Sequence, residues 1–416
     1  MQASYEVMRS KLKANQIGYS DNDGSQIARL IDARKQKERF VLFSLALLIP
    51  LTVLMAFSNG AVDIDLSRVF SYWASQLFDS LFDSLFDSSA NPSSPSEWGG
   101  YSDTPENMTY AQQSLIFLEL RMPRIAMTLI TGAALALSGA VLQSLCRNPL
   151  ADPGLIGVSS GAALFAALGM WGLSALPVHF SGFDAFLTTL PNWIMSAFIP
   201  ILAGIGALFT LALLLTVASS RAGISVLMLI LAGVAINAGA MTLLGFINFV
   251  ADDATLRQIT FWSMGSYAGV NQEIVLLSLS VVILGSIIIF RQQNALMLIS
   301  MGEKHASYMG VSINRVKLLC LLAVAAMVAI CVSFTGIVGF VGLVVPHICR
   351  MLIGSHLRVL LPASAMLGAI LVTFADTLSR IVLVPQELPI GLITSAVGVP
   401  FFLYLILREK KRQQYV

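Results

Sequence analysis

Apolar stretches long enough to cross a lipid bilayer alternate with polar segments along most of the chain. A membrane-spanning helix needs about 20 predominantly apolar residues, and residues 40–58 form the first such run. We interpret this run and nine later ones as transmembrane helices. The later runs cover approximately residues 124–146, 154–173, 194–218, 225–250, 273–290, 318–335, 340–353, 359–380 and 389–407.

The run at 340–353 is short for a span. It contains Pro346 and several glycines, which indicate a helix packed inside protein and shielded from lipid. With this run included, the ten spans place both termini on the same side of the membrane. The sequence therefore predicts an all-α polytopic membrane protein.

Composition supports a membrane environment. Charged residues make up 12% of the 416 residues and hydrophobic residues 56%, whereas soluble domains carry about 25% charged residues. The four cysteines lie in or beside apolar runs without a CxxC pair, so neither a disulfide nor a metal site is expected from them. About forty polar residues precede the first apolar run, so no signal peptide is expected.

The distribution of Lys and Arg fixes an orientation. Loops on the cytoplasmic side of a membrane carry an excess of these residues. With both termini inside, twenty of the twenty-five Lys and Arg residues lie in inner segments, eight of them in residues 1–39. The other five are Arg68, Arg121, Arg124, Arg257 and Arg380.

This topology divides the chain into five parts. They are a cytoplasmic N-terminal tail at 1–39, the first span at 40–58, an outer insertion at 59–120, a core of nine spans at 121–407, and a basic cytoplasmic tail at 408–416. The insertion repeats LFDS three times between Leu77 and Ser88. The repeats are interpreted either as an amphipathic helix on the outer membrane face or as a repeat expansion tolerated in a loop.

Spans two to five and seven to ten form two sets of four helices. The sets are offset by five spans, and an odd offset inverts one set relative to the other. Inverted-topology repeats of this kind are common in transporters.

Charged residues near the outer ends of the spans are candidate sites. Arg121 and Arg124 flank Met122 and Pro123 just before the second span, where a paired cationic surface could dock an acidic partner or the side chains could simply reach the interface. Asp376 and Arg380 lie four residues apart on one helix face and can pair. A structural ion pair is the favoured interpretation for Asp376, and Arg380 could also serve a partner.

Signatures of catalysis and nucleotide binding are absent. His347 has no second His or carboxylate at a metal-ligand spacing, and no GxxxxGK[ST] loop occurs. If the protein uses ATP, another polypeptide must bind it. The longest inner polar connection, Arg291–Lys317, is interpreted as either a stiff connector or a docking surface, with room for two small helices broken at Gly310.

Several blocks of sequence resemble the FecCD type of permease subunit, found in bacterial ABC importers for ferric siderophores, haem and cobalamin. The resemblance covers residues 115–410. Its blocks are RMPR from Arg121, GAALALSGAVLQ from Gly132, RNPLADPGLIGVSSGA from Arg147, LAGVAIN from Leu231, DATLRQITFWSMGS from Asp253, GEKHASYMGV from Gly302, TGIVGFVGLVVPHICRMLIGSHLRVLLP from Thr335, ADTLSR from Ala375 and ELPIGLITSAVGVPFFLYLI from Glu387. The long N-terminal tail and the acidic insertion depart from the pattern.

The resemblance implies a type II ABC importer permease in the bacterial inner membrane. Two permeases, identical or paralogous, would surround a pathway, with two ATPase subunits in the cytoplasm and a periplasmic protein delivering cargo. ATP would bind the ATPases, and this chain would hold no cofactor and catalyse no covalent step. Ferric siderophore is the expected cargo, with haem or cobalamin as the alternative.

The resemblance also implies roles for residues of this chain. The loop between spans six and seven would couple to the ATPase through Gly302, Glu303, Ala306, Met309, Gly310, Val311 and Asn314. Arg121, Arg124 and Arg380 would dock the binding protein. Spans five and ten would line the pathway, with the gate and pathway residues Ser225, Val226, Leu227, Gly233 and Asn237.

Two other classes of protein were weighed. A secondary transporter would be expected to hold coupling-ion carboxylates in mid-membrane, and only Asp376 lies within a span, near its end. An intramembrane enzyme would need a catalytic cluster, and the sequence shows none.

Overall fold

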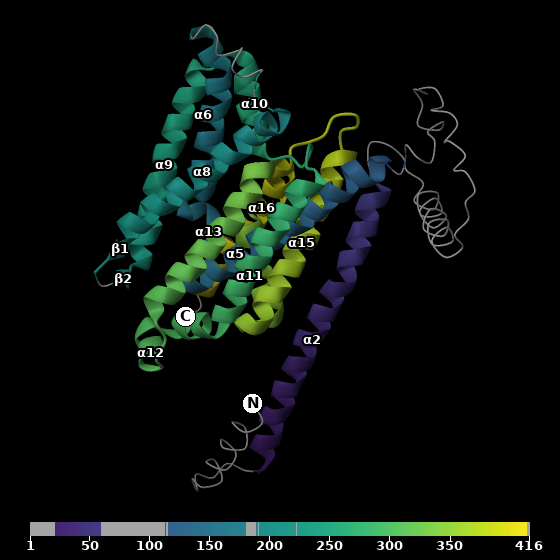
Figure 1. Cartoon of the computed structure of the whole chain (residues 1–416). Coiled ribbons are helices and arrows are strands. Elements are labelled where there is room, and N and C mark those ends of the chain that lie inside the picture. The colour runs from purple at the N-terminus through teal and green to yellow at the C-terminus, as the bar shows by residue number, and fades with distance from the viewer. Residues whose placement is uncertain are drawn as a thin grey trace, which may run out of the picture.

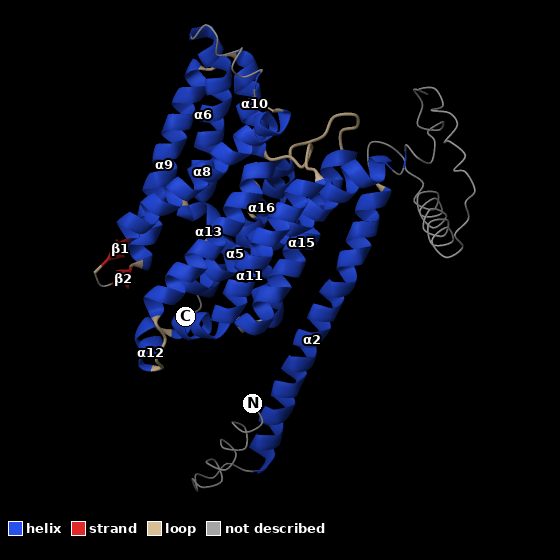
Figure 2. Cartoon of the chain, viewed as in Figure 1, coloured by secondary structure: helices blue, strands red, loops and turns tan. Residues whose placement is uncertain are grey.

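The computed structural model describes residues 21–59, 113, 115–179, 189, 191–221 and 223–413. The first twenty residues and the LFDS repeats lie outside this part of the chain. Within it, nearly all residues form helices (Figures 1 and 2). The nine longest are α2 (Asp21–Ser58), α5 (Met122–Leu145), α6 (Val158–His179), α8 (Asn192–Ala218), α9 (Val226–Val250), α11 (Gln272–Met301), α13 (Ile313–Thr335), α15 (Leu357–Ile381) and α16 (Ile390–Gln413).

Shorter elements join these helices. They are the π-helix η2 (Phe117–Arg121), the 3-10 helix η3 (Pro153–Ile156), α10 (Asp253–Met264), α12 (Glu303–Tyr308), α14 (Val341–Ile353), and the strands β1 (Ser219–Ser220) and β2 (Gly223–Ile224). The two strands form an antiparallel hairpin immediately before α9.

Ten apolar helices match the ten predicted spans. Eight helices of the described chain are long and apolar enough to cross a membrane, and Val341–Ile353 and Ile390–Tyr404 are shorter apolar helices. The fold is therefore an all-α polytopic membrane protein. The set α5, α6, α8 and α9 and the set α13 to α16 have opposite orientations across the bilayer, because corresponding helices of the two sets are offset by five spans.

The helices surround α5. It is the most enclosed of the candidate spans, with 83% of its apolar window buried, whereas the same figure for α2 is 11%. α11, α13, α14 and α15 pack on α5, α2 packs mainly on α15, and α6, α8 and α9 pack together at one side (Figure 1). A single chain thus leaves α2, α9 and α11 largely exposed to lipid or to partners.

Small residues allow the close approach of α5 to its neighbours. A Cβ atom added to Gly132 would lie 2.2 Å from the carbonyl oxygen of Gly368 in α15, and one added to Gly139 would lie 1.9 Å from that of Gly342 in α14. Without a hydrophobic driving force between helices in lipid, such close backbone packing supplies much of the attraction.

The prediction for α14 is confirmed. The helix has only 13 residues, and most of its side chains are buried, among them Val341 to Pro346. After α5 the chain from Arg147 to Asp152 is not helical, and it turns before η3 begins at Pro153.

The segment Arg291–Lys317, predicted as a polar connection with room for two small helices broken at Gly310, is mostly helical and does break at Gly310. α11 continues eleven residues past its predicted end, to Met301. Ala, Leu and Met have high helix propensity, and the segment ALMLISM continues the helix until Gly302 stops it. A single short helix, α12, follows, and the chain turns at Gly310 (φ +81°) before α13 starts at Ile313.

Two predicted segment boundaries also differ. α2 starts at Asp21, so the described part of the tail (residues 21–39) and the first span form one continuous helix without a break at residue 40. The chain is already helical at Leu115, so the core begins inside the segment predicted as insertion. α10 lies where no span or helix was predicted; it begins where the Asp252 side chain accepts backbone N–H groups and ends at Gly265 (φ +78°).

Candidate functional site

Functional residues predicted from the sequence gather at the two opposite ends of the bundle. We call these the α10 end and the α12 end, after the short helix that each carries (Figure 1). The three arginines lie at the α10 end. The predicted coupling and gate residues lie at or near the α12 end.

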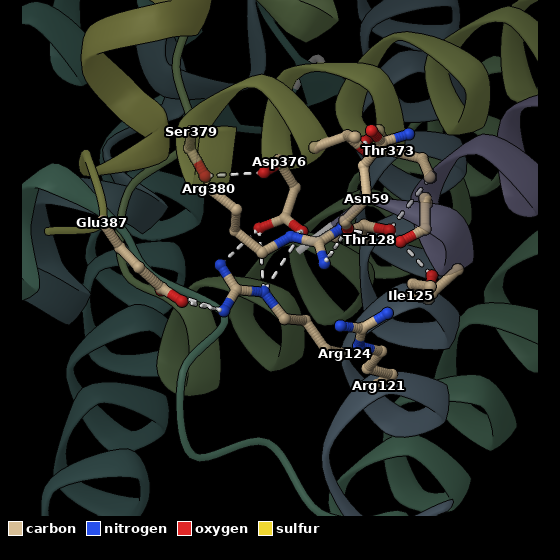
Figure 3. Close-up of polar contacts among 12 residues, drawn as sticks. Asn59, Arg121, Arg124, Ile125, Thr128, Thr373, Asp376, Ser379, Arg380 and Glu387 are labelled. Carbon is tan, nitrogen blue, oxygen red and sulfur yellow. Dashed lines mark hydrogen bonds and ion pairs between the residues drawn. The ribbon is translucent and has the colours of Figure 1, made fainter. Parts of the chain in front are cut away.

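Arg124 is the centre of an ion network at the α10 end (Figure 3). Its Nε and Nη2 donate to the Asp376 carboxylate at 3.1 and 2.9 Å, and its Nη1 donates to both oxygens of Glu387 at 2.9 Å. Arg380 pairs with the second Asp376 oxygen at 3.2 Å. The predicted pair of Asp376 and Arg380 is thus confirmed, and the links to Arg124 and Glu387 are additional.

The end of α2 covers the other two arginines. Arg380 donates to the carbonyl oxygens of Ala56 (3.2 Å) and Asn59 (3.0 Å), and Arg121 donates to that of Phe57 (2.5 Å). The last carbonyl groups of a helix lack intrahelical donors and attract cations. Both arginines are consequently buried, with relative exposures of 7% for Arg121 and 5% for Arg380.

Arg124 and Glu387 are the more accessible part of the network. The Glu387 side chain is 38% exposed and that of Arg124 13%. A partner that approached the α10 end would therefore meet Glu387 first and Arg124 behind it. The structure brings the three predicted docking arginines together, and all three already have partners within this chain.

Glu303 is the centre of a second network, at the α12 end. Its carboxylate accepts from Lys317 Nζ at 2.9 Å and lies 3.5 Å from Arg147 Nη2. Arg147 also donates to the carbonyl oxygen of Ile299 at the end of α11 (3.0 Å). The first residue of α12 is thus held to α13 and to the turn that follows α5.

The same network reaches the hairpin before α9. Lys317, only 3% exposed, also donates to the carbonyl oxygen of Ile224 at 2.7 Å. The Ile224 N–H donates to Asn314 Oδ1 at 3.3 Å. Glu303 and Asn314, both predicted for coupling, thereby connect α12 to the start of α9 through β2.

The remaining coupling residues divide between anchors and an exposed tip. Ala306 is fully buried and Val311 half-buried. Gly302 joins α11 to α12 with φ +153°, a conformation that favours glycine. Tyr308, Met309 and Gly310 are exposed, with Tyr308 at 86% and Met309 at 73%. The tip could contact a partner while its base remains fixed.

The predicted gate residues fall on two faces of α9. Ser225 caps the helix by accepting from the Met228 N–H, and Val226 and Leu227 follow, with Leu227 63% exposed. Gly233 instead packs against the backbone of η3, where an added Cβ would lie 1.9 Å from the Leu155 carbonyl oxygen. Asn237 accepts from Ser160 and donates to Gly154. Gly233 is therefore buried and Asn237 half-buried, and both contact η3 or the turn before α6.

The segment that Gly233 and Asn237 contact, η3 and the residue before it, is stabilised by its own hydrogen bonds. The Asp152 carboxylate accepts the Gly154 N–H at 2.7 Å and caps η3. Burial raises the pKa of this carboxyl above its ordinary value, and the Gly154 hydrogen bond partly opposes the shift. Within the described residues, no group of three or more His, Cys, Asp and Glu side chains could hold a metal ion.

Sequence reasoning missed three members of these networks. Arg147 and Lys317 were counted only among the cations that set the orientation of the chain. Glu387 was given no functional role. One available signal was Lys317, a cation at the start of an apolar run, because such a cation is costly unless it is paired.

The comparisons with known proteins show that this bundle of spans is the fold of an ABC transporter permease. Residues 47–408 match the model of the FecCD transport family. The chain belongs to this family. The family's ABC permeases import metal chelates, haem, vitamin B12 or siderophores, and they are transport subunits rather than enzymes.

Individual relatives span several cargoes. The chain is 41% identical to the hemin transport system permease HmuU of Yersinia pestis, over 72% of this chain and 85% of the relative. It is 38% identical to the vitamin B12 permease BtuC of Vibrio cholerae (72% and 84%) and 32% identical to the iron(3+)-hydroxamate permease FhuG of Bacillus subtilis (72% and 85%).

A solved structure supports the same architecture. An inward-facing transporter assigned to the metal-chelate ABC type superposes with a TM-score of 0.67 at 29% identity. The match covers 89% of this chain and 99% of the solved chain.

Proposed function

We propose that this chain is the permease subunit of an ATP-driven importer that moves a ferric-siderophore chelate from the periplasm to the cytoplasm. A periplasmic binding protein delivers the chelate, and two separate ATPase subunits supply the energy. The observation that carries the proposal is the exposed tip of α12, whose base is tied through Glu303 and Lys317 to the start of α9. An ATPase subunit can bind the exposed tip. The hydrogen bonds of Lys317 to Glu303 and Ile224 can then transmit movement of the tip to α9.

The α12 end faces the cytoplasm in this proposal. Twenty of twenty-five Lys and Arg residues then lie in cytoplasmic segments, as the positive-inside rule requires. Both termini are cytoplasmic and the membrane is the bacterial inner membrane. The α10 end faces the periplasm.

Coupling follows from the contacts of Glu303. When the ATPases close on ATP, they displace the Tyr308–Gly310 tip, and α12 moves as one short rigid helix. Lys317 then transmits the displacement to Ile224, because charge-assisted hydrogen bonds are short and directional. The start of α9, at Ser225, Val226 and Leu227, opens or closes the inner gate.

The pathway forms between two permeases, either two copies of this chain or this chain and a paralogue. α9 and α16 line it, and the broad exposed apolar face of α9 (Leu227, Leu231, Val234, Phe246, Phe249) supports that placement. Gly233 and Asn237 act indirectly, by holding α9 against η3.

The binding protein docks at the α10 end. Arg121, Arg124 and Arg380 hold a concentrated positive charge there, which Asp376 and Glu387 partly balance. An acidic residue of the binding protein would compete with Glu387 for Arg124, the most accessible of the three guanidinium groups.

Haem is a second candidate cargo, and the 41% identity to the Yersinia hemin permease favours it.

Deletion of the gene followed by uptake assays with labelled ferric siderophore, haem and cobalamin tests the proposal. Loss of siderophore uptake alone, restored by this chain, would support it. Loss of only haem or cobalamin uptake would reassign the cargo, and ion-driven uptake by the purified chain without ATPases would refute the importer class.

A further inference from the structure

A cationic cleft lies at the α12 end, away from both networks. It has a volume of about 310 Å³ and is formed between the lower part of α2 and the end of α14. Its lining residues are Arg34, Lys37, Glu38, Arg350, Met351, Leu352, Ile353 and Gly354.

The lining holds three cations and one carboxylate. Arg34 Nε donates to Glu38 at 3.1 Å, which balances this pair. The Arg34 guanidinium also lies over Gly354, where an added Cβ would come within 3.1 Å of Nη2. Among the described residues, no carboxylate pairs with Lys37 or Arg350. The cleft therefore has an uncompensated positive charge and favours an anion.

The apolar side chains beside the cleft favour an anionic lipid over a free anion. Phe40 and Phe43, each 69% exposed, begin the apolar lipid-facing surface of α2 within two turns of Lys37. Met351 and Leu352 of the cleft itself are 42% and 45% exposed. Cations beside exposed apolar side chains match a molecule with a negative headgroup and acyl chains. Free phosphate would leave the apolar part of the lining in water.

We propose that this cleft binds the phosphate headgroup of an anionic phospholipid. Lys37 and Arg350 contact the phosphate, and Met351 and Leu352 contact the upper acyl chains. Basic pockets at the membrane surface bind such headgroups. The lipid would fix α2, which is otherwise the least enclosed span, to the rest of the bundle. The proposal is independent of the cargo and of the ATPase partners.

Native mass spectrometry of the purified full-length chain tests this binding. The probes are phosphatidylglycerol, phosphatidylcholine and inorganic phosphate, each titrated separately. Phosphatidylglycerol should bind the chain and raise its unfolding temperature, and the other two should not. With about 1 kcal/mol per basic residue near the membrane surface, K37Q/R350Q should bind phosphatidylglycerol roughly 30-fold more weakly.

The double variant K35Q/R39Q is the matched control. Lys35 and Arg39 are exposed on the same helix but do not line the cleft, so their loss should leave the affinity nearly unchanged. If Arg350→Gln fails to fold, the exposed single variant Lys37→Glu provides the same test. Equal weakening in the control variant, equal binding of phosphatidylcholine, or equal stabilisation by phosphate alone would each overturn the proposal.

Discussion

Single buried charges decide much of the stability at the α10 end. Asp376 is 1% exposed and forms ion pairs with two guanidinium groups, those of Arg124 and Arg380. Removal of one member of a buried ion pair leaves the other charge without compensation, and that cost exceeds the net value of the pair itself. The arginines near it are therefore structural residues whatever further role they have.

Asp376→Asn should destabilise the protein by about 3–5 kcal/mol, because Arg124 and Arg380 would remain buried without their carboxylate. Thermal unfolding in detergent measures the change. Asp253→Asn, an exposed carboxylate at the same end, should have little effect. The double variant Asp376→Asn/Arg380→Met should cost less than the sum of its single variants, and strict additivity would contradict the network.

Glycines at helix crossings form the second sensitive class of residues. Gly139→Ala should lower the unfolding temperature, since the new methyl group would lie 1.9 Å from the Gly342 carbonyl oxygen and overpacking costs about 1–3 kcal/mol. Gly172→Ala in α6 is the control, because its Cβ would meet only Leu176 at 3.9 Å. The control should be neutral or stabilising, and equal destabilisation of both variants would exclude the crossing as the cause.

At the scale of elements, α12 acts together with its neighbours. Glu303 binds α13 and the turn after α5, and Lys317 extends the connection to the hairpin before α9. In the proposed mechanism, the exposed tip contacts the ATPase and the buried base transmits the movement to α9. Substitutions in the base should therefore separate ATP hydrolysis from transport.

Lys317→Met should lower transport per ATP hydrolysed by about tenfold, since a hydrogen bond to a charged group contributes roughly 1.5–3 kcal/mol. Reconstituted complexes in proteoliposomes measure both rates. Arg315→Met, an exposed cation on the same helix, should retain the wild-type ratio. A Lys317→Met complex with an unchanged ratio would contradict the proposed connection.

Gly310→Pro should also uncouple hydrolysis from transport. Gly310 has φ +81°, and proline is restricted to φ of about −65°, so the turn between α12 and α13 cannot keep its shape. Ser312→Pro is a stringent control two residues away, because Ser312 already has φ −76°. Wild-type coupling in the Gly310 variant, or equal loss in both variants, would count against a specific role of the turn.

At the scale of the whole molecule, a different partner is proposed for each end of the bundle. The binding protein is proposed for the α10 end and the ATPases for the α12 end. Reversing Arg121, Arg124 and Arg380 to Glu is a poor test of docking, because two of these side chains are buried in contacts with α2. The burial of Arg121 and Arg380 predicts that such a variant would lose stability.

Glu387→Gln is a cleaner probe of the α10 end. It releases Arg124 from an exposed competitor, so affinity for the binding protein should rise about two- to fivefold, the range expected for an exposed ion pair. Surface plasmon resonance at two salt concentrations measures this effect. Glu119→Gln, another exposed carboxylate near this end, should change little. An unchanged or lower affinity for Glu387→Gln would argue against docking at Arg124.

The sequence by itself determined the spans, their number and the class of protein. Lipid as a solvent imposes a strong local rule, so about 20 apolar residues mark a helix wherever they occur. The pair Asp376–Arg380 was equally readable, because residues four apart share one helix face. The C-terminal extension of α11 could not be predicted from the sequence, because helix propensity beyond an apolar run is a weak signal.

Only the tertiary structure decided which distant charges meet. Arg124 and Asp376 are 252 residues apart, and Lys317 reaches Ile224 across 93 residues. Such contacts depend on packing accurate to a fraction of an ångström, which close glycine crossings set and local composition does not encode. The same packing turned Gly233 and Asn237 toward η3, and it placed Arg350 beside Lys37 to form a cleft that neither segment contains alone.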